Sequence, residues 1–377
     1  MEKYDIIVVG MGIMGGAAAY QAARRGLKVL GLEQFDQIGH AMGSSHGETR
    51  VIRQAYYEHP DYVPLVQDAW NEWKELERLT RQSILVQTGG LMMGLPSSEV
   101  VRGAIAAAVA HQLPYEIWDA TQVMRRFPAF HVTAEEVAVW EPMAGYIKAE
   151  ASLLAMVSFA TSRGATIHTG ENVLAMTSQS PNEVEITTNK DRYSAGAVIL
   201  TVGPWATRWF PAWPLAVERQ VPFWFDGPKL RAMTQYPIYI HENRQGQHTY
   251  GFPYIDGQGL KIARHHGGEI STIDTVQRKV VQDDKAALES TLDFLPDVLT
   301  SSVCREEVCL YTNSPDSHFI IGRHPQYHGH VIVGAGFSGH GFKFAPTIGR
   351  LLLDLAQNLH ADELPLFSPL RNAIQLH

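Results

Sequence analysis

Cysteine is scarce in this chain: 377 residues contain two, Cys304 and Cys309. The two do not form a CxxC pair, and they cannot make a zinc site by themselves. A chain of this length buries a sufficient core without disulfide or metal staples. So few cysteines are typical of a reducing compartment, and we expect a cytoplasmic protein without a metal site.

Long apolar runs and blocks of like charge are also missing. The most apolar early stretch, residues 6–20, follows acidic residues and is interrupted by Gly10, Gly12, Gly15 and Gly16. It therefore predicts a strand, a turn and a helix rather than a signal peptide. No run approaches the roughly 18–20 apolar residues that span a bilayer. The net charge of −8 argues against a nucleic-acid or anionic-membrane partner.

The composition is that of a soluble globular enzyme, with 45% hydrophobic and 19% charged residues. The length suits two domains. A buried strand over residues 4–9, a helix over 15–25 and a strand over 28–32 form an N-terminal βαβ unit. Further helices are expected at 62–79, 98–112 and 150–164, and further strands at 89–94 and 197–202. Residues 330–333 predict a strand, followed by a glycine-rich turn and a helix through residue 355.

Residues 215–270 alternate apolar and turn residues, which predicts a mostly antiparallel sheet. The expected fold class is therefore α/β (α+β, two domains), with a Rossmann-type nucleotide-binding domain and an antiparallel substrate domain. We assign residues 1–83, 147–214 and 320–377 to the first domain and residues 84–146 and 215–319 to the second.

The turn after the first strand carries a dinucleotide fingerprint, Gly10-Met11-Gly12-Ile13-Met14-Gly15. Gly10 permits the sharp turn, Gly12 the approach of a pyrophosphate, and Gly15 the packing of helix on sheet. Glu33, at the end of the second strand, can accept hydrogen bonds from a ribose. The pattern predicts a dinucleotide site without separating FAD from NAD.

Five later segments are more specific. They are GSSHGETRVIR at 43–53, YGFP at 250–253, Lys261 with His265, CLYTNSPD at 309–316 and GAGFSGHGFK at 334–343. In this order and spacing they resemble the monomeric sarcosine oxidase and N-methyltryptophan oxidase family, over essentially the whole chain. That resemblance implies an FAD-dependent oxidoreductase that acts on CH–NH groups with O2 as acceptor, and a monomer.

The resemblance also implies a cofactor-binding set. Cys309 matches the cysteine that carries FAD through a thioether; read without its neighbours it is an ordinary buried cysteine. Other matched or fingerprint residues near the cofactor are Gly10, Gly12, Gly15, Glu33, Ser44, His46, Thr49, Gly203 and Gly336.

Charged and aromatic residues complete the implied site. Arg53 and Lys343 match the cations that hold a substrate carboxylate, which suits the forked guanidinium. Lys261 matches a lysine that activates O2, because a fixed cation stabilises superoxide-like charge. The remaining implied catalytic residues are Arg50, His265 and Tyr311, and the remaining substrate-binding residues are Tyr250, Tyr56 and Gly339. For His265, a packing role is nearly as well supported, and it lacks partners at metal-ligand spacing.

Two places depart from the family pattern. Relatives usually have two adjacent histidines where this chain has Ser45-His46, and a glycine-containing loop where it has Tyr57 and His59-Pro60. The bulkier, stiffer loop puts the substrate side chain in doubt. Tyr239 is a further candidate near the variable part of the pocket.

Three hypotheses follow. The first is oxidative N-demethylation of a sarcosine-like or N-methyltryptophan-like amino acid by O2, giving the amino acid, formaldehyde and hydrogen peroxide. Cyclic secondary amino acids or glycated amino acids are alternative substrates on the same scaffold. The second is a dehydrogenase that passes electrons to a carrier, against which Lys261 argues. The third, a non-catalytic nucleotide-binding subunit, would not need Arg53, Lys261, Cys309 and Lys343 together.

Overall fold

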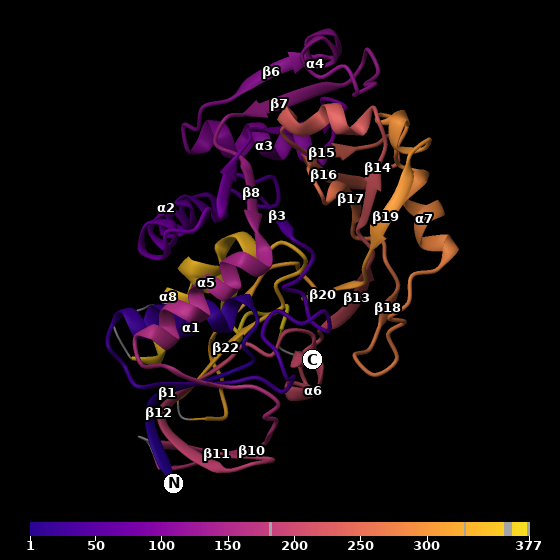
Figure 1. Ribbon diagram of the computed structural model, residues 1–377. Helices are drawn as coiled ribbons and strands as arrows, with labels where there is room; N and C mark the ends of the chain where they lie inside the picture. Colours follow the sequence, from indigo (N-terminus) through magenta and orange to yellow (C-terminus); the bar gives the residue numbers. More distant parts are fainter. Residues whose placement is uncertain (181–182, 328, 358–363, 375–377) are drawn as a thin grey trace.

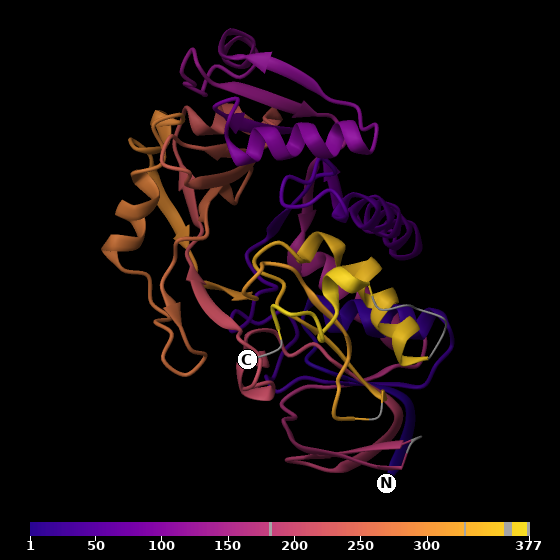
Figure 2. The ribbon, with the colours of Figure 1, turned by 180° about the vertical axis from the view of Figure 1, so that it is seen from behind.

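The structure, a computed structural model, describes residues 1–180, 183–327, 329–357 and 364–374. It has two parts, a nucleotide-binding part built on a mainly parallel sheet and a second part built on a large, mostly antiparallel sheet (Figures 1 and 2). The α/β fold class expected from the sequence is confirmed.

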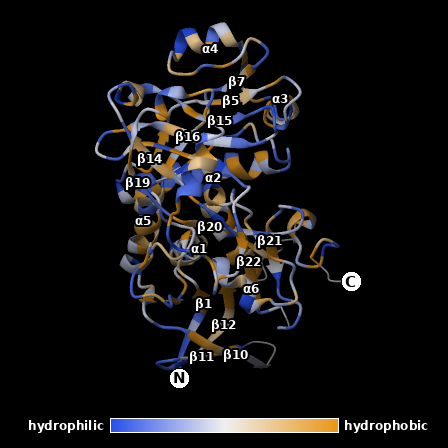
Figure 3. Ribbon diagram, turned by 90° about the vertical axis from the view of Figure 1, so that its right-hand side faces the viewer, coloured by the Kyte–Doolittle hydropathy of each residue, from blue (hydrophilic) through white to orange (hydrophobic). Residues whose placement is uncertain are grey.

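The first sheet follows from β-branched, fully buried strands, which is the composition expected of parallel strands covered on both faces. Its parallel members are ordered β9-β2-β1-β12-β22, and β10, β11 and β21 add antiparallel pairs at its margins. The strands are β1 (Glu2–Val9), β2 (Val29–Leu32), β9 (Thr166–His168), β10 (Val173–Ser180), β11 (Glu183–Thr188), β12 (Arg192–Leu200), β21 (Ile320–Arg323) and β22 (Val331–Ala335). Figure 3 shows hydrophobic residues concentrated around β12 and β22.

Three helices lie together beside this sheet, with α1 packed between the other two (Figure 1). They are α1 (Ile13–Arg24), α5 (Ala149–Ser162) and α8 (Ala345–Ala356). Alanine and glycine on α1 let the helices approach closely; a Cβ at Gly349 of α8 would lie 2.5 Å from the backbone of Ala17. The long helix α2 (Tyr62–Thr80) packs against α8 and α5.

The second sheet has eight strands in the order β19-β14-β17-β16-β15-β5-β7-β6. Every pairing is antiparallel except β15 with β5, which agrees with the prediction for residues 215–270. The strands are β5 (Gly90–Gly94), β6 (Glu116–Asp119), β7 (Val137–Glu141), β14 (Phe223–Asp226), β15 (Ile238–Glu242), β16 (His248–Ile255), β17 (Gly259–His265) and β19 (Ser302–Glu306). The helices here are α3 (Glu99–Ala110), α4 (Ala120–Arg126) and α7 (Gln282–Glu289).

Two small sheets lie between the two large ones (Figure 1). One is β3 (Thr49–Ile52), β8 (Gly145–Lys148) and β4 (Leu85–Gln87). The other is β18 (Ile270–Ser271), β13 (Ala216–Gln220) and β20 (Cys309–Asn313). The short helices are α6 (Ala206–Trp209), η1 (Gly203–Trp205), η2 (Leu230–Gln235), η3 (Pro296–Val298), η4 (Phe342–Phe344) and η5 (Pro365–Phe367).

The sequence located these elements well and their ends less well. α1 begins at Ile13, two residues before the expected start, and β12 begins at Arg192 rather than at residue 197. The extra residues of β12 pair with β11 in a hairpin and with β1 across a long sequence separation, and a buried apolar run reveals neither pairing. Among the described residues, we find no helix of the length and apolarity needed to traverse a bilayer.

Candidate functional site

The loop between β1 and α1 has the geometry that its glycines predict. Gly10 has φ +87°, and a Cβ there would lie 2.6 Å from the carbonyl oxygen of Thr201. A Cβ at Gly15 would lie 2.0 Å from the carbonyl oxygen of Gly10. A Cβ at Gly12 would meet only Ser45 Oγ, at 3.2 Å, so the backbone at Gly12 is open. The loop is therefore tight at its two ends and accessible in the middle.

Glu33 closes this loop at the end of β2. Its Oε2 accepts a 3.0 Å hydrogen bond from the Met11 N–H, and its Oε1 accepts a 3.1 Å bond from the Phe35 N–H. His40 Nε2 lies 3.4 Å from the same Oε1. The carboxylate is almost fully buried, yet it lines a cavity. It can thus accept further hydrogen bonds from a ligand there.

A first cavity runs from this loop to β20 and holds about 1290 Å³ of empty space, including its open mouth. A helix N-terminus at α1, open backbone at Gly12 and the buried acid Glu33 suit the pyrophosphate and ribose of a dinucleotide. Cys309, Arg50 and the glycine-rich turn after β22 also line this cavity. The residues present therefore fit FAD.

A second cavity of about 800 Å³, including its open mouth, lies beside the first, and six charged residues are among those that line it. The two cavities share five wall residues, namely Arg50, Cys309, Tyr311, Gly339 and Phe342. A group held in the first cavity can thus meet a small molecule in the second at this shared wall.

Most residues expected in the site lie on these two cavities. The first is lined by Gly10, Gly12, Glu33, Ser44, Arg50, Gly203, Cys309, Tyr311, Gly336 and Gly339. The second is lined by His46, Arg50, Arg53, Tyr250, Lys261, His265, Cys309, Tyr311, Gly339 and Lys343. Residues that are more than 300 positions apart in the sequence thus converge on one place.

Arg50 and Cys309 meet at the shared wall. The Arg50 guanidinium donates to the carbonyls of Thr49, Ser44 and His46, at 2.8, 3.0 and 2.5 Å. One of its nitrogens lies 3.8 Å from Cys309 Sγ. Carbonyl acceptors hold the cation in place, and no carboxylate among the described residues forms an ion pair with it, so its charge is available to the thiol and the cavity.

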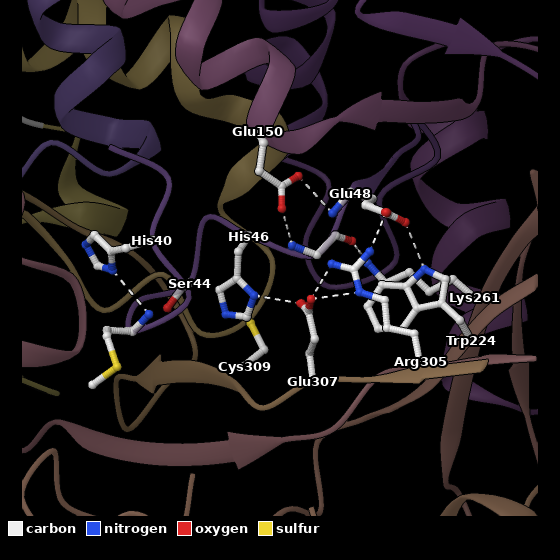
Figure 4. A network of polar contacts seen from close by, with 12 residues as sticks. His40, Ser44, His46, Glu48, Glu150, Trp224, Lys261, Arg305, Glu307 and Cys309 are labelled. Atoms are coloured by element: carbon white, nitrogen blue, oxygen red, sulfur yellow. Dashed lines mark hydrogen bonds and ion pairs between the residues drawn. The ribbon is translucent and has the colours of Figure 1, made fainter. Parts of the chain in front are cut away.

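Lys261, on β17, reaches the second cavity from the large sheet. Its Nζ donates to the carbonyls of Gly47 and Thr49, at 2.5 and 2.9 Å, and lies over the rings of Trp224 and Phe252. Burial and the nearby Arg50 lower the pKa of Lys261 well below its ordinary value. Figure 4 shows the lysine beside a network of acids and an arginine.

Arg53 and Lys343, like Lys261, are buried basic residues that line the second cavity. Arg53 donates to Glu58 Oε2 at 2.5 Å and to the Ala55 carbonyl at 2.9 Å, with the Tyr57 ring 4.1 Å from its guanidinium carbon. Lys343 Nζ donates to the His340 carbonyl at 2.8 Å. Burial, together with the Arg53 charge, lowers the pKa of Lys343 to about 7. Burial raises the pKa of Glu58, but Arg53, His340 and Lys343 together outweigh this effect and hold the pKa below the ordinary value.

Aromatic and imidazole groups also line the second cavity. His265 Nδ1 is 3.2 Å from the Tyr311 hydroxyl, and Tyr250 lies beside them. Burial, reinforced by His266, lowers the pKa of His265 well below its usual range. His265 is thus a neutral ring at neutral pH. Gly339 has φ +75°, and a Cβ there would lie 2.4 Å from the Tyr311 ring, so only glycine fits beside this ring.

Four expected positions do not reach either cavity wall. Tyr56 is fully buried, and its hydroxyl lies 2.5 Å from Nδ1 of His340, which lines the second cavity. Tyr57 lines this cavity instead of Tyr56. Thr49 contributes its carbonyl to Lys261 and Arg50, and Gly15 packs behind the loop. Tyr239 lies in the core of the large sheet among aromatic rings, too far inside to face a substrate.

Several acids around the site were not anticipated. Glu58 pairs with Arg53, Glu307 pairs with His46, and Glu150 accepts hydrogen bonds from the Gly47 and Glu48 N–H groups. The sequence drew attention to Glu58 alone among these acids, because Glu58 lies beside Tyr57 in the loop that departs from the family pattern. Within the described ranges, no cluster of His, Cys, Asp and Glu has an arrangement that could hold a metal ion.

The fold and the two joined cavities define a dinucleotide-dependent oxidoreductase. Residues 5–355 match the family described as FAD dependent oxidoreductase. The chain is 39% identical to a monomeric sarcosine oxidase from Streptomyces avermitilis, covering 98% of both chains. It is 34% identical to an N-methyl-L-tryptophan oxidase from Yersinia pestis, covering 94% of this chain and 95% of that protein. Among solved structures, NikD, an amino acid oxidase of nikkomycin biosynthesis, superposes with a TM-score of 0.85 at 25% identity and full coverage of both chains.

The chain therefore belongs to the FAD-dependent oxidoreductase family, as its sequence motifs indicated. It is an FAD-dependent oxidoreductase.

Proposed function

We propose that the protein is an oxidase of secondary amino acids that removes the methyl group of an N-methyl amino acid with O2. The products are the amino acid, formaldehyde and hydrogen peroxide. One observation carries this proposal: the buried cations Arg53 and Lys343 line a small cavity whose wall also contains Cys309 and Lys261.

The two cations are suited to a substrate carboxylate. A carboxylate buried between them gains charge-assisted hydrogen bonds that a neutral pocket cannot offer. Glu58 Oε2 already occupies such a position on Arg53, at 2.5 Å. A substrate carboxylate would replace Glu58 on the guanidinium, and Glu58 would turn to solvent, to which it is partly exposed.

The same anchoring orients the amine. Arg53 and Lys343 hold one end of the substrate, so the amine and its methyl group lie toward the wall formed by Cys309 and Tyr311. FAD, when bound, supplies the two-electron acceptor for the carbon–nitrogen bond. Orientation of this kind supplies a large share of catalysis. His265, a neutral ring beside Tyr311, is available to hydrogen-bond an uncharged amine.

The cofactor in this proposal is attached covalently through Cys309. The thiol lies at the boundary of the two cavities, where the end of a dinucleotide that starts at Gly12 would arrive. Ser44 Oγ donates to the Leu310 carbonyl at 2.5 Å, which holds the cysteine-bearing strand against the loop that carries His46.

Lys261 is proposed as the group that promotes reaction with O2. Its ammonium is held by two carbonyls in a buried wall, on the strand that approaches from the large sheet. A fixed cation stabilises the negative charge that electron transfer to O2 creates. A dehydrogenase that uses a carrier would not need this group.

The names of the curated relatives support the choice of substrate class, since they are oxidases of sarcosine and N-methyl-L-tryptophan. Tyr57, packed on Arg53, lines the second cavity and is proposed to select the side chain. Cyclic and glycated amino acids remain the alternative substrates. We further propose a monomeric, cytoplasmic enzyme.

A peroxide assay over three substrate groups tests the proposal. The groups are N-methyl amino acids, cyclic secondary amino acids and glycated amino acids, each with the matching primary amine as a control. Turnover of an N-methyl amino acid, with one formaldehyde for each peroxide, is expected. Turnover of only cyclic or glycated compounds would change the substrate class to that group. Turnover of none of the three groups would overturn the proposed function.

A further inference from the structure

The turn that precedes β3 is bound by two elements from different parts of the molecule. Glu150, at the start of α5, accepts hydrogen bonds from two consecutive backbone N–H groups, those of Gly47 at 2.6 Å and Glu48 at 2.9 Å (Figure 4). The Ala149 N–H also donates to the Glu48 carbonyl, at 2.7 Å. From the large sheet, Lys261 Nζ donates to the Gly47 carbonyl at 2.5 Å. The turn thus connects α5 to the lysine of β17.

Glu150 and Lys261 bind the two ends of one peptide group. The carbonyl that accepts from the Lys261 ammonium belongs to Gly47. The N–H of the same peptide group belongs to Glu48, and it donates to Glu150 Oε2. A peptide group is polarised as a unit, because its C–N bond has partial double-bond character. A carboxylate on the N–H therefore makes the carbonyl oxygen a stronger acceptor for the ammonium at the other end.

The backbone of this turn needs such support. Gly47 has φ +90° and Glu48 has φ +65°, and the second value is unfavourable for a residue with a side chain. A Cβ at Gly47 would lie 3.6 Å from Lys261 Nζ, so the backbone lies close to the ammonium. Gly47 is buried, and Glu150 supplies the acceptor for its N–H. Glu150 thereby fixes the direction of the Gly47 carbonyl.

Opposing groups set the charge of Lys261. Burial and, second, Arg50 lower its pKa well below the ordinary value, whereas Cys309, Glu150 and Glu307 act to raise it. Two further charged residues contact the Trp224 ring that lies over Nζ, namely Glu48 and Arg305. Because burial and Arg50 both favour the neutral amine, loss of one carboxylate moves Lys261 further from the charged form that the O2 reaction requires.

We propose that Glu150 is a positioning residue for Lys261, which acts through the peptide group between Gly47 and Glu48. It fixes the carbonyl that holds the ammonium, and it favours the protonated lysine. Glu150 lines neither of the two cavities, so it reaches the O2 reaction through this turn. The inference rests on the O2 role of Lys261 in the proposed function and extends that role to a residue outside the site.

The first test measures the protonation of Lys261 in the flavin-loaded protein without turnover. Acetic anhydride acylates only the neutral amine, so the acetylation rate of the Lys261 peptide, followed by mass spectrometry at several pH values, reports the pKa. Glu150→Gln removes the charge and nearly keeps the shape. Its acetylation should begin at a pH about one unit below that of the wild type, a tenfold change in the ratio of protonated to neutral lysine.

A second variant separates the charge of Glu150 from its packing. Glu150→Asp keeps the charge on a shorter side chain, so it should shift the acetylation profile less than Glu150→Gln does. A residue that only packs would give the reverse order, because glutamine is the closer match in shape. A Glu150→Gln profile that coincides with the wild type, or a larger shift in Glu150→Asp, overturns the inference.

Glu77→Gln is the matched control. Glu77 Oε1 also accepts from two consecutive backbone N–H groups, those of Ile84 and Leu85 at 2.8 and 3.0 Å. Glu77 lies on α2 and lines neither cavity. Its substitution should lower the urea concentration of unfolding and leave the acetylation of Lys261 as in the wild type. A shift equal to that of Glu150→Gln would show a general loss of packing and would also overturn the inference.

The second test compares the two flavin half-reactions in Glu150→Gln and Lys261→Met. In Glu150→Gln, reoxidation of the reduced flavin by O2 should be about tenfold slower, in step with the lost ammonium, while anaerobic reduction by substrate changes little. Unaltered reoxidation in Glu150→Gln, together with slowed reoxidation in Lys261→Met, overturns this inference alone. Unaltered reoxidation in both variants overturns the O2 role of Lys261, which is a failure of the proposed function.

Discussion

Lys343 and Arg53 are both buried cations, but burial affects their charges differently. A guanidinium stays protonated in any protein environment. The Lys343 ammonium does not, because burial, reinforced by Arg53, lowers its pKa to about 7. Arg53 therefore gives the second cavity a permanent charge, and Lys343 adds one that depends on pH.

This difference predicts how carboxylate binding varies with pH. A simple carboxylate such as propionate stays ionised from about pH 6 to about pH 9. Its Kd should rise as the pH passes about 7 and Lys343 loses its proton, as measured from the change in flavin absorbance. In Lys343→Met, binding should be weaker at pH 6 and nearly independent of pH. A Kd that does not change with pH in the wild type would contradict the assignment.

A second prediction for a single residue concerns the buried carboxyl of Glu141 and the pH dependence of stability. Its carboxyl accepts hydrogen bonds from the Gln54 and Ala55 N–H groups, at 2.5 and 3.1 Å, directly after Arg53. Burial raises its pKa to about 7, although these two N–H groups and Arg53 oppose the shift. Between pH 4.5 and about pH 7, the Glu141 carboxyl is thus protonated in the folded protein but ionised in the unfolded chain. The stabilisation from this protonated carboxyl is therefore fully present below pH 4.5 and is lost as the pH rises to about 7.

The free energy of unfolding of the wild type should therefore fall by about 3 kcal/mol between pH 4.5 and about pH 7. The free energy of unfolding of Glu141→Gln should not show this fall. Urea unfolding of both proteins at several pH values measures the difference. The glutamine should also cost about 1–3 kcal/mol at low pH, since one backbone N–H loses its acceptor. Parallel pH profiles for the two proteins would show that Glu141 does not titrate in this way.

Several single-residue features could not be read from the sequence. Tyr56 and Tyr57 are adjacent in an irregular loop, where no periodicity tells which ring faces the cavity. The pairs of Glu58 with Arg53 and Glu307 with His46 depend on side-chain geometry, and the second spans 261 positions. The resemblance located the cations and Cys309, but it carried no information on these acids.

At the scale of elements, the β1–α1–β2 unit was predictable because its signals are local. Apolar runs, three spaced glycines and a terminal acid lie within residues 4–33. The three glycines nevertheless have different physical roles. A Cβ at Gly15 would lie 2.0 Å from backbone, whereas one at Gly12 would lie 3.2 Å from a side-chain oxygen that can shift.

Substituting each glycine by alanine should separate folding from cofactor binding. Gly15→Ala should destabilise FAD-free protein by about 2 kcal/mol or more, because backbone atoms cannot move aside cheaply. Gly12→Ala should unfold at nearly the wild-type urea concentration but take up FAD more slowly, because the pyrophosphate needs close approach to that backbone. Equal stability losses in the two variants would refute this division of roles.

At the scale of the whole molecule, the site is assembled from four sheets. Gly10 follows β1, Arg50 lies on β3, Lys261 on β17 and Cys309 on β20. The sequence indicated two kinds of sheet, but not that the small β3 and β20 sheets would bring the cavities together. Such long-range assembly leaves no periodic signal in the chain.

This arrangement predicts that the two half-reactions can be separated. Lys261→Met should slow reoxidation of the reduced flavin by O2 by about a hundredfold or more, a typical effect of removing one preorganised charge. Flavin reduction by substrate without O2 should change little, because Arg53 and Lys343 remain. Rapid-mixing absorbance measurements of each step test this, and unaltered reoxidation would point to a carrier-dependent dehydrogenase.

The most direct measurement is the flavin absorbance of the purified protein after anaerobic mixing with an N-methyl amino acid, followed by admission of air. Bleaching of the flavin by the N-methyl compound but not by its primary-amine counterpart is predicted, with recovery in air and release of one formaldehyde and one hydrogen peroxide per cycle. A flavin that no secondary amino acid bleaches, at substrate concentrations well above those that saturate carboxylate binding, would contradict the account.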